Sequence, residues 1–305
     1  MTNRNNGWVG AISGPPKEKG LYMKQLKEVL ARGLFTVAAC ISILAVALIC
    51  IFLFVNGIPG MVQIGIVDFI TGTRWKPGNN IYGIMPMIIG SIYVTAGALI
   101  IGVPGGILTA VFLSKFASKR TVKFMKPAVS LLAGIPSVVF GFFGLVVIVP
   151  LVRKFFGGSG SSLLAACVLL GMMILPTIIT VSESALNAVP HSYYEGALAL
   201  GASHERAVFK VMLPAAKSGV TASIILGMGR AIGEAMAVMM VSGNRAVVPD
   251  SLIKGVRTLT TNIVMEMGYA ADLHREALIA TAVVLFVFIL IINLLFSILK
   301  RRARL

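Results

Sequence analysis

The sequence predicts an all-α polytopic membrane protein with six transmembrane helices, and composition and segment length both support this class. Of the 305 residues, 57% are hydrophobic and only 12% are charged, whereas soluble domains carry about 25% charged residues. Six apolar segments reach the length of about 20 residues that a helix needs to cross a bilayer. These segments are 34–57, 83–113, 128–151, 162–181, 218–242 and 276–298. Their apolar residues run continuously and do not alternate, which argues against a transmembrane barrel.

The first apolar segment follows an N-terminal arm, residues 1–32. Leu21, Leu26, Val29 and Leu30 alternate with charged residues in this arm, as in an amphipathic helix at the cytoplasmic membrane surface. The segment after it is too long and too far from the start for a cleaved signal peptide, whose apolar core has about 7–15 residues. We therefore expect a cytoplasmic arm followed by one transmembrane domain, residues 33–305.

The basic residues predict the orientation of the chain. Eighteen of the 27 Lys and Arg residues fall in the two terminal regions and in the segments 114–127 and 182–217, against eight in the three remaining loops. Since cytoplasmic loops carry the excess of Lys and Arg, both termini and the 182–217 loop are predicted to be cytoplasmic. This distribution accounts for the net charge of +16, so the charge gives no reason to expect a nucleic-acid partner.

The second and third apolar segments contain prolines and glycines that predict kinked, closely packed helices. Pro86 and Pro104 lie in the second segment, and Gly134-Ile135-Pro136-Ser137 lies in the third. Packing alone explains these residues. If a substrate passes here, Ser137 and the backbone groups freed near Pro136 would form the polar lining. The cysteines Cys40, Cys50 and Cys167 also lie in apolar segments and are interpreted as packing residues.

Two loops are assigned to the outer side of the membrane. The loop 58–82 has turn residues and the interfacial aromatics Trp75 and Tyr82. In the extracytoplasmic loop 243–275, apolar residues recur every three or four positions after Pro249, which predicts an interfacial helix. They are Leu252, Ile253, Val256, Leu259, Ile263, Val264 and Met267.

The fifth segment contains two charged residues, Arg230 and Glu234, near the middle of the bilayer. An Arg at that depth costs about 2.5–3.5 kcal/mol on insertion scales, so such groups face a protein interior or water and mark a pathway. The i, i+4 spacing would place both on one helix face, where they can pair. Gly229 and Gly233 have a spacing that would bring a neighbouring helix close. A purely structural ion pair is the alternative.

The cytoplasmic loop 182–217 is predicted to form a helix–turn–helix. One helix should run from near Ser192 to Leu200, and Gly201 should break it. A second should start at Ser203 and run toward Leu213-Pro214. The apolar residues of this loop could pack under the membrane helices or fit a partner's groove, and we expect different faces to do each.

Several enzyme classes are excluded by missing motifs. The chain has no Gly-x-x-x-x-Gly-Lys-[Ser/Thr] loop for ATP. The glycines from Gly227 to Gly233 miss the dinucleotide fingerprint by one residue, and the three histidines are dispersed. The chain is predicted to have no catalytic residues, no metal site and no cofactor of its own.

The 182–217 loop resembles the EAA loop by which membrane subunits of ATP-binding-cassette (ABC) importers dock onto their ATPases. The matching residues are Glu195, Gly196, Ala197, Gly201, Leu213 and Pro214. Gly196 stands where the loop pattern has its first Ala, a change that is conservative in size. The resemblance implies that these residues couple the chain to a separate ATPase, whereas the plainer interpretation is an ordinary amphipathic loop.

Longer stretches resemble the phosphate-specific transport permeases, and the first favours their C-type over their A-type subunit. These stretches are 74–77, 82–86, 133–141 and 227–237, within a resemblance that covers about residues 30–300. It implies a type I ABC importer permease fold in a bacterial inner membrane. It also implies an A-type permease partner, an ATPase dimer that binds ATP and Mg²⁺, and an extracytoplasmic phosphate-binding protein.

The residues then divide into two sets of functions. Arg230, Glu234 and Ser137 would belong to the substrate pathway, and the EAA-type residues to ATPase coupling. A permease for another oxyanion, a self-energised anion carrier or channel, and a structural or signalling membrane protein are the alternatives. A self-energised carrier would be expected to show broken helices in repeated halves with its own ion site, and the sequence instead offers one intramembrane pair and a docking loop.

Overall fold

The computed structural model describes residues 17–302, so the start of the N-terminal arm lies outside the described residues. By its contacts the chain forms two units that divide after Phe52. The first unit consists of the beginning of helix α1 (Lys17–Ile64), whose side chains from Glu28 to Ile49 are exposed in this chain. The helix runs from Lys17 into the first span without a break, so the separate surface helix predicted for the arm is not observed.

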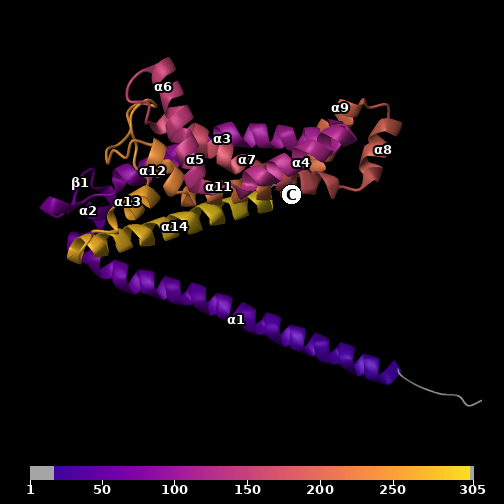
Figure 1. Ribbon diagram of the computed structural model, residues 1–305, viewed down its shortest axis with the longest axis horizontal. Helices are drawn as coiled ribbons and strands as arrows, with labels where there is room; N and C mark the ends of the chain where they lie inside the picture. The colour runs from indigo at the N-terminus through magenta and orange to yellow at the C-terminus, as the bar shows by residue number, and fades with distance from the viewer. Residues whose placement is uncertain (1–16, 303–305) are drawn as a thin grey trace, which may run out of the picture. The chain divides into compact units, whose positions relative to one another are not determined.

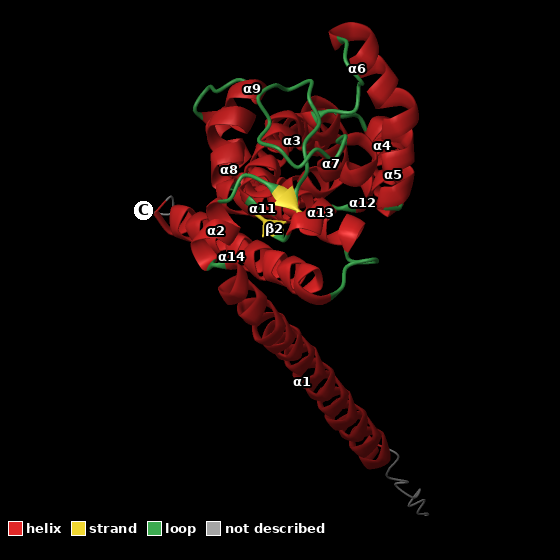
Figure 2. Ribbon diagram, turned by 90° about the vertical axis from the view of Figure 1, so that its left-hand side faces the viewer, coloured by secondary structure: helices red, strands yellow, loops and turns green. Residues whose placement is uncertain are grey.

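The second unit is a helical bundle with one short antiparallel hairpin, in which Trp75 pairs with Tyr82. Figure 1 shows α8 and α9 at one end of α3 and α7, and the hairpin with α2 and α13 at the opposite end. Figure 2 looks onto the hairpin end. The strands are β1 (Trp75–Lys76) and β2 (Ile81–Tyr82). The α-helices after α1 are α2 (Ile66–Thr71), α3 (Met85–Val111), α4 (Lys119–Gly134), α5 (Ser137–Phe143), α6 (Val149–Phe156), α7 (Leu163–Asn187), α8 (His191–Ala199), α9 (His204–Ala207), α10 (Leu213–Ala215), α11 (Lys217–Gly233), α12 (Met236–Val241), α13 (Leu259–Glu266) and α14 (Asp272–Arg302). The label η denotes a 3₁₀ helix in η1 (Pro77–Asn79) and a π-helix in η2 (Phe112–Phe116), η3 (Gly144–Ile148) and η4 (Val208–Met212).

The prediction of an all-α membrane protein is confirmed. Among the described residues, five helical segments are long and apolar enough to cross a membrane, and there are six if a bent pair counts as one span. That pair joins His204–Ala215 to Lys217–Gly233 at an angle of 69°. This bend lies just before the fifth apolar segment, 218–242. That segment is itself interrupted between Gly233 and Met236, beside the charges that it carries.

The third span is shifted from its predicted position, 128–151. Helix α4 ends at Gly134, Ile135 is extended, and the span runs over Ser137–Phe156. Pro136 explains the break, because proline lacks a donor and disfavours the helical conformation of the residue before it. Helix α4 has no buried side chain, so it lies along the surface of this chain.

The core lies between α3 and α7, where small residues let the two helices approach. A Cβ at Gly102 would meet the Ile174 side chain at 2.6 Å, and one at Gly106 would meet Ile178 at the same distance. Cys167 is buried in this core, as predicted. Cys40 is exposed and Cys50 half-buried, so the packing role expected for all three cysteines is not observed for Cys40 in this chain.

Candidate translocation site and coupling surface

The helix that carries Arg230 breaks directly before Glu234. Helix α11 ends at Gly233, Glu234 adopts an extended conformation with ψ of 121°, and α12 begins at Met236. The prediction that Arg230 and Glu234 share one helix face and pair is wrong in this structure. The Glu234 carboxylate instead accepts a hydrogen bond from the Ala237 backbone N–H at 3.1 Å and so caps the first turn of α12.

Arg230 is half-buried and points toward α7. Its Nη1 donates to the Thr177 hydroxyl at 3.4 Å, and it forms no salt bridge within the part of the chain that the structure describes. A guanidinium keeps its charge at any physiological pH. Among the described residues, the site therefore presents a positive charge without a salt bridge near the end of an apolar helix.

The predicted close helix contact at Gly229 and Gly233 is not observed within this chain. A Cβ at either glycine would meet nothing within 4 Å, and the close approach occurs at Gly227, where a Cβ would lie 3.0 Å from Ile178. The side of α11 that carries Gly229 and Gly233 is thus open to a partner or to a passage.

Ser137 starts helix α5, directly after the Pro136 break, and is half-buried. Helix α5 packs on α12 through Gly141, where a Cβ would meet the Met240 sulfur at 2.6 Å. Ser137 therefore lies on an element that contacts the far side of the break. The described hydrogen bonds do not join it to Arg230 or Glu234.

The loop 243–275 folds back onto the same break. The Thr260 hydroxyl donates to the Glu234 carbonyl at 3.1 Å, and the Leu259 N–H donates to the Ser91 hydroxyl on α3 at 2.9 Å. The helix predicted from Pro249 onward is confined to α13, Leu259–Glu266. Val256 forms a bridge with Gly243 and is fully buried, so this part of the loop is held in the bundle as extended chain.

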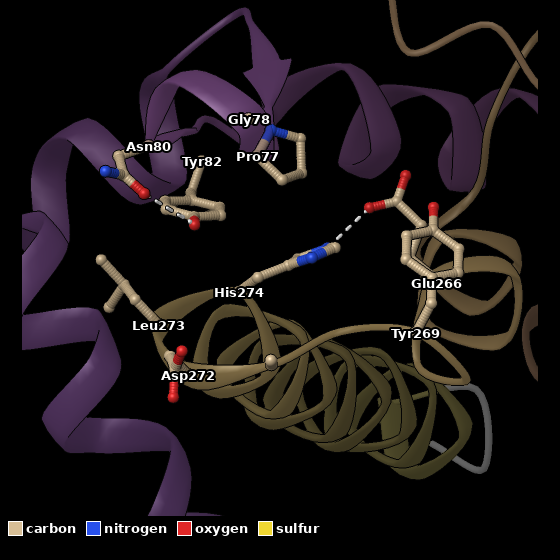
Figure 3. Close-up of a pocket in the computed structure, with 10 residues that line it drawn as sticks. Pro77, Gly78, Asn80, Tyr82, Glu266, Tyr269, Asp272, Leu273 and His274 are labelled. Carbon is tan, nitrogen blue, oxygen red and sulfur yellow. Dashed lines mark hydrogen bonds and ion pairs between the residues drawn. The ribbon is translucent and has the colours of Figure 1, made fainter.

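Glu266 is the centre of a buried polar network at the hairpin end of the bundle. Its carboxylate accepts from Arg257 Nη1 at 2.6 Å and from Trp75 Nε1 at 2.7 Å, and His274 Nε2 lies at 2.8 Å. Figure 3 shows Glu266 and His274 beside a cavity of about 550 Å³, with Tyr82 and Tyr269 in its wall. Burial raises the pKa values of both tyrosines, so these phenols are neutral at physiological pH.

Replacing Glu266 with alanine is expected to destabilise the protein by about 3–5 kcal/mol, because it leaves the half-buried Arg257 without its counter-charge. Thermal unfolding in detergent would measure this as a large drop in the midpoint. The matched control is Asp250→Ala, since the Lys254–Asp250 pair has the same 2.6 Å separation but is exposed. Equal midpoints for the two variants would contradict this account of the network.

The helix–turn–helix of residues 191–215 is called the knob below. Helix α8 ends in a Schellman motif in which Ala202 N–H donates to the Ala197 carbonyl and Gly201 N–H to the Leu198 carbonyl. Gly201 has φ of +81°, the left-handed conformation that the sequence predicted. Ser203 then caps α9 by accepting from the Arg206 N–H at 3.3 Å, so the predicted restart is also confirmed.

The two faces of the knob differ. Ala197 and Val208 are buried on one face, and Val208 packs in a cluster with Leu186 and Val220 below the membrane helices. On the other face Leu200 is 91% exposed, and Leu198 is 40% exposed. Exposed leucines on a rigid helical corner are what a docking surface requires.

The remaining EAA-type residues occupy distinct positions. Glu195 is exposed and pairs with His191 at 2.9 Å, and Gly196 faces open space. Leu213 packs against the cluster below the knob, whereas Pro214 is exposed in the first turn of α10. All six residues thus lie on one knob, where Ala197 and Leu213 face inward and Glu195 and Pro214 are exposed.

A model of the family "binding-protein-dependent transport system inner membrane component" matches residues 102–305. A Bacillus subtilis relative described as a probable ABC transporter permease protein, YqgH, is 41% identical over 285 residues, covering 90% of this chain and 92% of that protein. The phosphate transport system permease protein PstC of Haemophilus influenzae is 32% identical over 240 residues, covering 72% and 76%.

Solved structures share the fold at low identity. The MetNI methionine ABC transporter, in inward-facing conformations, aligns with a TM-score of 0.54 at 21% identity, covering 72% of this chain and 94% of that chain. A bacterial alginate-importing ABC transporter aligns with a TM-score of 0.57 at 14% identity, covering 91% and 99%.

The family model and the relatives define a membrane-spanning subunit of an ABC importer. The chain belongs to the family of binding-protein-dependent transport system inner membrane components. Sequence reasoning did not find Thr177 and Thr260. Thr177 accepts from Arg230 on one side of the helix break, and Thr260 donates to the Glu234 carbonyl on the other. Thr177 lies seven residues before Ser184 in an apolar helix. This spacing places both on one helix face and could have indicated Thr177 as part of a polar face.

Proposed function

We propose that this permease subunit imports inorganic phosphate, forms half of the translocation pathway and is driven by a separate ATPase. The observation that carries the proposal is Arg230, a charge without a salt bridge among the described residues, at a break inside the membrane. Phosphate carries one to two negative charges, and the planar guanidinium offers donors that match its oxygens. The relatives described as PstC phosphate permeases support this choice of substrate.

Glu234 and Ser137 have supporting roles in this proposal. The Glu234 carboxylate caps α12 and its carbonyl accepts from Thr260, so it holds the break open beside Arg230. Its own charge would repel an anion, and the cap keeps that charge turned toward the Ala237 backbone N–H. Ser137, at the start of α5, offers a hydroxyl to the pathway.

The partners follow from the surfaces. The exposed face of the knob would dock on an ATPase, which binds ATP and Mg²⁺. The face of α4 and α5, with Phe124 at 78% and Phe142 at 60% exposure, would meet an A-type permease. A phosphate-binding protein would deliver its ligand at the hairpin end. Under this assignment both termini and the knob are cytoplasmic, in a bacterial inner membrane.

Co-purification tests this assignment. The tagged chain, extracted in mild detergent, should carry with it a Walker-containing ATPase and a second homologous permease. The ATPase activity of that complex should rise with phosphate-loaded binding protein. Isolation of the chain alone, together with phosphate uptake that needs no ATP, would instead identify a self-energised carrier.

Orientation is tested by labelling single cysteines in a protein that lacks Cys40, Cys50 and Cys167. Ser192 on α8 and Ser159 in the 157–162 turn are both exposed. In intact cells an impermeant thiol reagent should label Ser159→Cys but not Ser192→Cys, whereas opened cells should label both. The reverse pattern in intact cells would invert the topology.

A further inference from the structure

Helix α7 carries a polar face in its last three turns. Thr177, Thr180, Glu183, Ser184 and Asn187 fall within an arc of about 120° at 100° per residue. Ser182, the remaining polar residue of this stretch, points the other way and bonds to the buried Ser223 at 2.7 Å. The face is thus continuous over about 15 Å of helix, at the rise of about 1.5 Å per residue.

Apart from Glu183, this face is largely uncovered by the chain itself. Thr180, Ser184 and Asn187 are exposed, and Thr177 is half-buried. A membrane-spanning helix does not turn such residues to lipid, so they face a partner or a water-filled passage. Arg230 contacts the end of the face that is farther from the knob, through Thr177. Asn187, at the other end of the face, is the last residue of α7 before the knob.

A second cation lies at the knob end of the face. Lys126 on α4 pairs with Glu183 at 2.6 Å, and Glu183 is 8% exposed. Between α4 and α7 lies a cavity of about 190 Å³, equal to the volume of about six water molecules. Its polar lining comprises Lys126, Ser130, Thr180, Glu183, Ser184 and Asn187.

We propose that this cavity is an exit site for the transported oxyanion, in which Lys126 and the hydroxyls of α4 and α7 receive phosphate from Arg230. The proposal rests on the phosphate transport proposed above. An ammonium, hydroxyls and an amide N–H₂ are all donors to a tetrahedral oxyanion, and the cavity gathers these groups in one place.

Glu183 makes the site reversible. In the structure it neutralises Lys126, so an arriving anion has to displace its carboxylate. Asn187 Nδ2 already donates to Glu183 at 3.5 Å, and the Ser114 hydroxyl donates to Asn187 Oδ1 at 2.7 Å. Glu183 thus retains a donor when Lys126 turns to the anion. Because Arg230 lacks a salt bridge and Lys126 has one, an anion is held more weakly at the second site, which favours release.

Phosphate uptake by the reconstituted complex tests the site. Lys126→Gln is expected to lower the maximal uptake rate about tenfold, because a charge-assisted hydrogen bond is lost, and Lys126→Arg should retain most of it. The control Lys123→Gln removes the same charge one turn earlier on α4 and should match the wild type. Glu183→Gln should lower uptake by less than Lys126→Gln, because it frees the ammonium for the anion but slows release.

The outcomes separate this site from the proposed function. A wild-type complex that takes up no phosphate would overturn both. Normal phosphate uptake by the wild type, with Lys126→Gln equal to Lys123→Gln, would overturn the exit site alone. Equal losses in Lys126→Gln and Glu183→Gln would also overturn it, since they indicate a structural ion pair.

A second measurement leaves Lys126 in place. In the background without native cysteines, Thr180→Cys should react with an anionic methanethiosulfonate reagent, and inorganic phosphate should slow the reaction in the energised complex. Ser182→Cys, on the buried side of α7, should not react. Labelling of Thr180→Cys at the same rate with and without phosphate would contradict the exit site.

Discussion

Replacing Arg230 with glutamine is expected to abolish phosphate uptake while the protein still inserts and assembles. Glutamine keeps a polar amide at this position, but it is shorter than arginine and carries no charge. The anion would then cross a low-dielectric passage without compensation from this subunit, which costs several kcal/mol and lowers the rate by at least 100-fold. Uptake of radiolabelled phosphate, normalised to the amount of assembled complex, measures the effect.

Two further variants refine this expectation. Arg230→Lys keeps the charge but loses the planar fork, so it should retain only a fraction of uptake. Thr177→Val removes the hydroxyl that accepts from Arg230 Nη1 and should have a smaller effect. Normal uptake by a well-assembled Arg230→Gln complex would mean that the pathway charge comes from the partner permease.

Gly201→Val is expected to leave the protein in the membrane but to uncouple it from its ATPase. Gly201 has φ of +81°, and a β-branched side chain is strongly disfavoured there. A Cβ at Gly201 would touch nothing within 4 Å, so the damage comes from the backbone and is confined to the knob. We expect loss of ATPase co-purification and at least a tenfold loss of phosphate uptake.

Matched substitutions separate backbone strain from changed surface. Gly201→Asn adds a side chain of similar size that tolerates the left-handed conformation, and it should keep the ATPase. Gly196→Ala fills open space on α8 without a positive φ, and restores the alanine of the EAA pattern. If Gly201→Val binds the ATPase and imports phosphate like the wild type, the knob has no part in coupling.

The parts of the fold that local chemistry determines were predictable from the sequence. Apolar length predicted the membrane helices, and the Gly201 and Ser203 signals predicted the turn of the knob because a Schellman motif and an N-cap involve only neighbouring residues. The sequence predicted a kink at Pro136 but not a complete break of the helix, so the third span was placed too early.

The pairing of Arg230 with Glu234 failed for a tertiary reason. The i, i+4 argument assumed a continuous helix, and Glu234 is instead held extended through Thr260, which lies 26 residues away in sequence. The Glu266 network was missed because its Trp75 donor lies 191 residues away. No periodicity in either segment reports such a contact.

Transport by a defined complex tests the central claim most directly. Proteoliposomes would contain this chain, its partner permease and the ATPase, with phosphate-loaded binding protein outside and ATP inside. We expect ATP-dependent accumulation of phosphate that excess sulfate does not reduce and that is lost when this chain carries Arg230→Gln. Accumulation of sulfate in place of phosphate, or phosphate entry that is independent of ATP, would contradict the account.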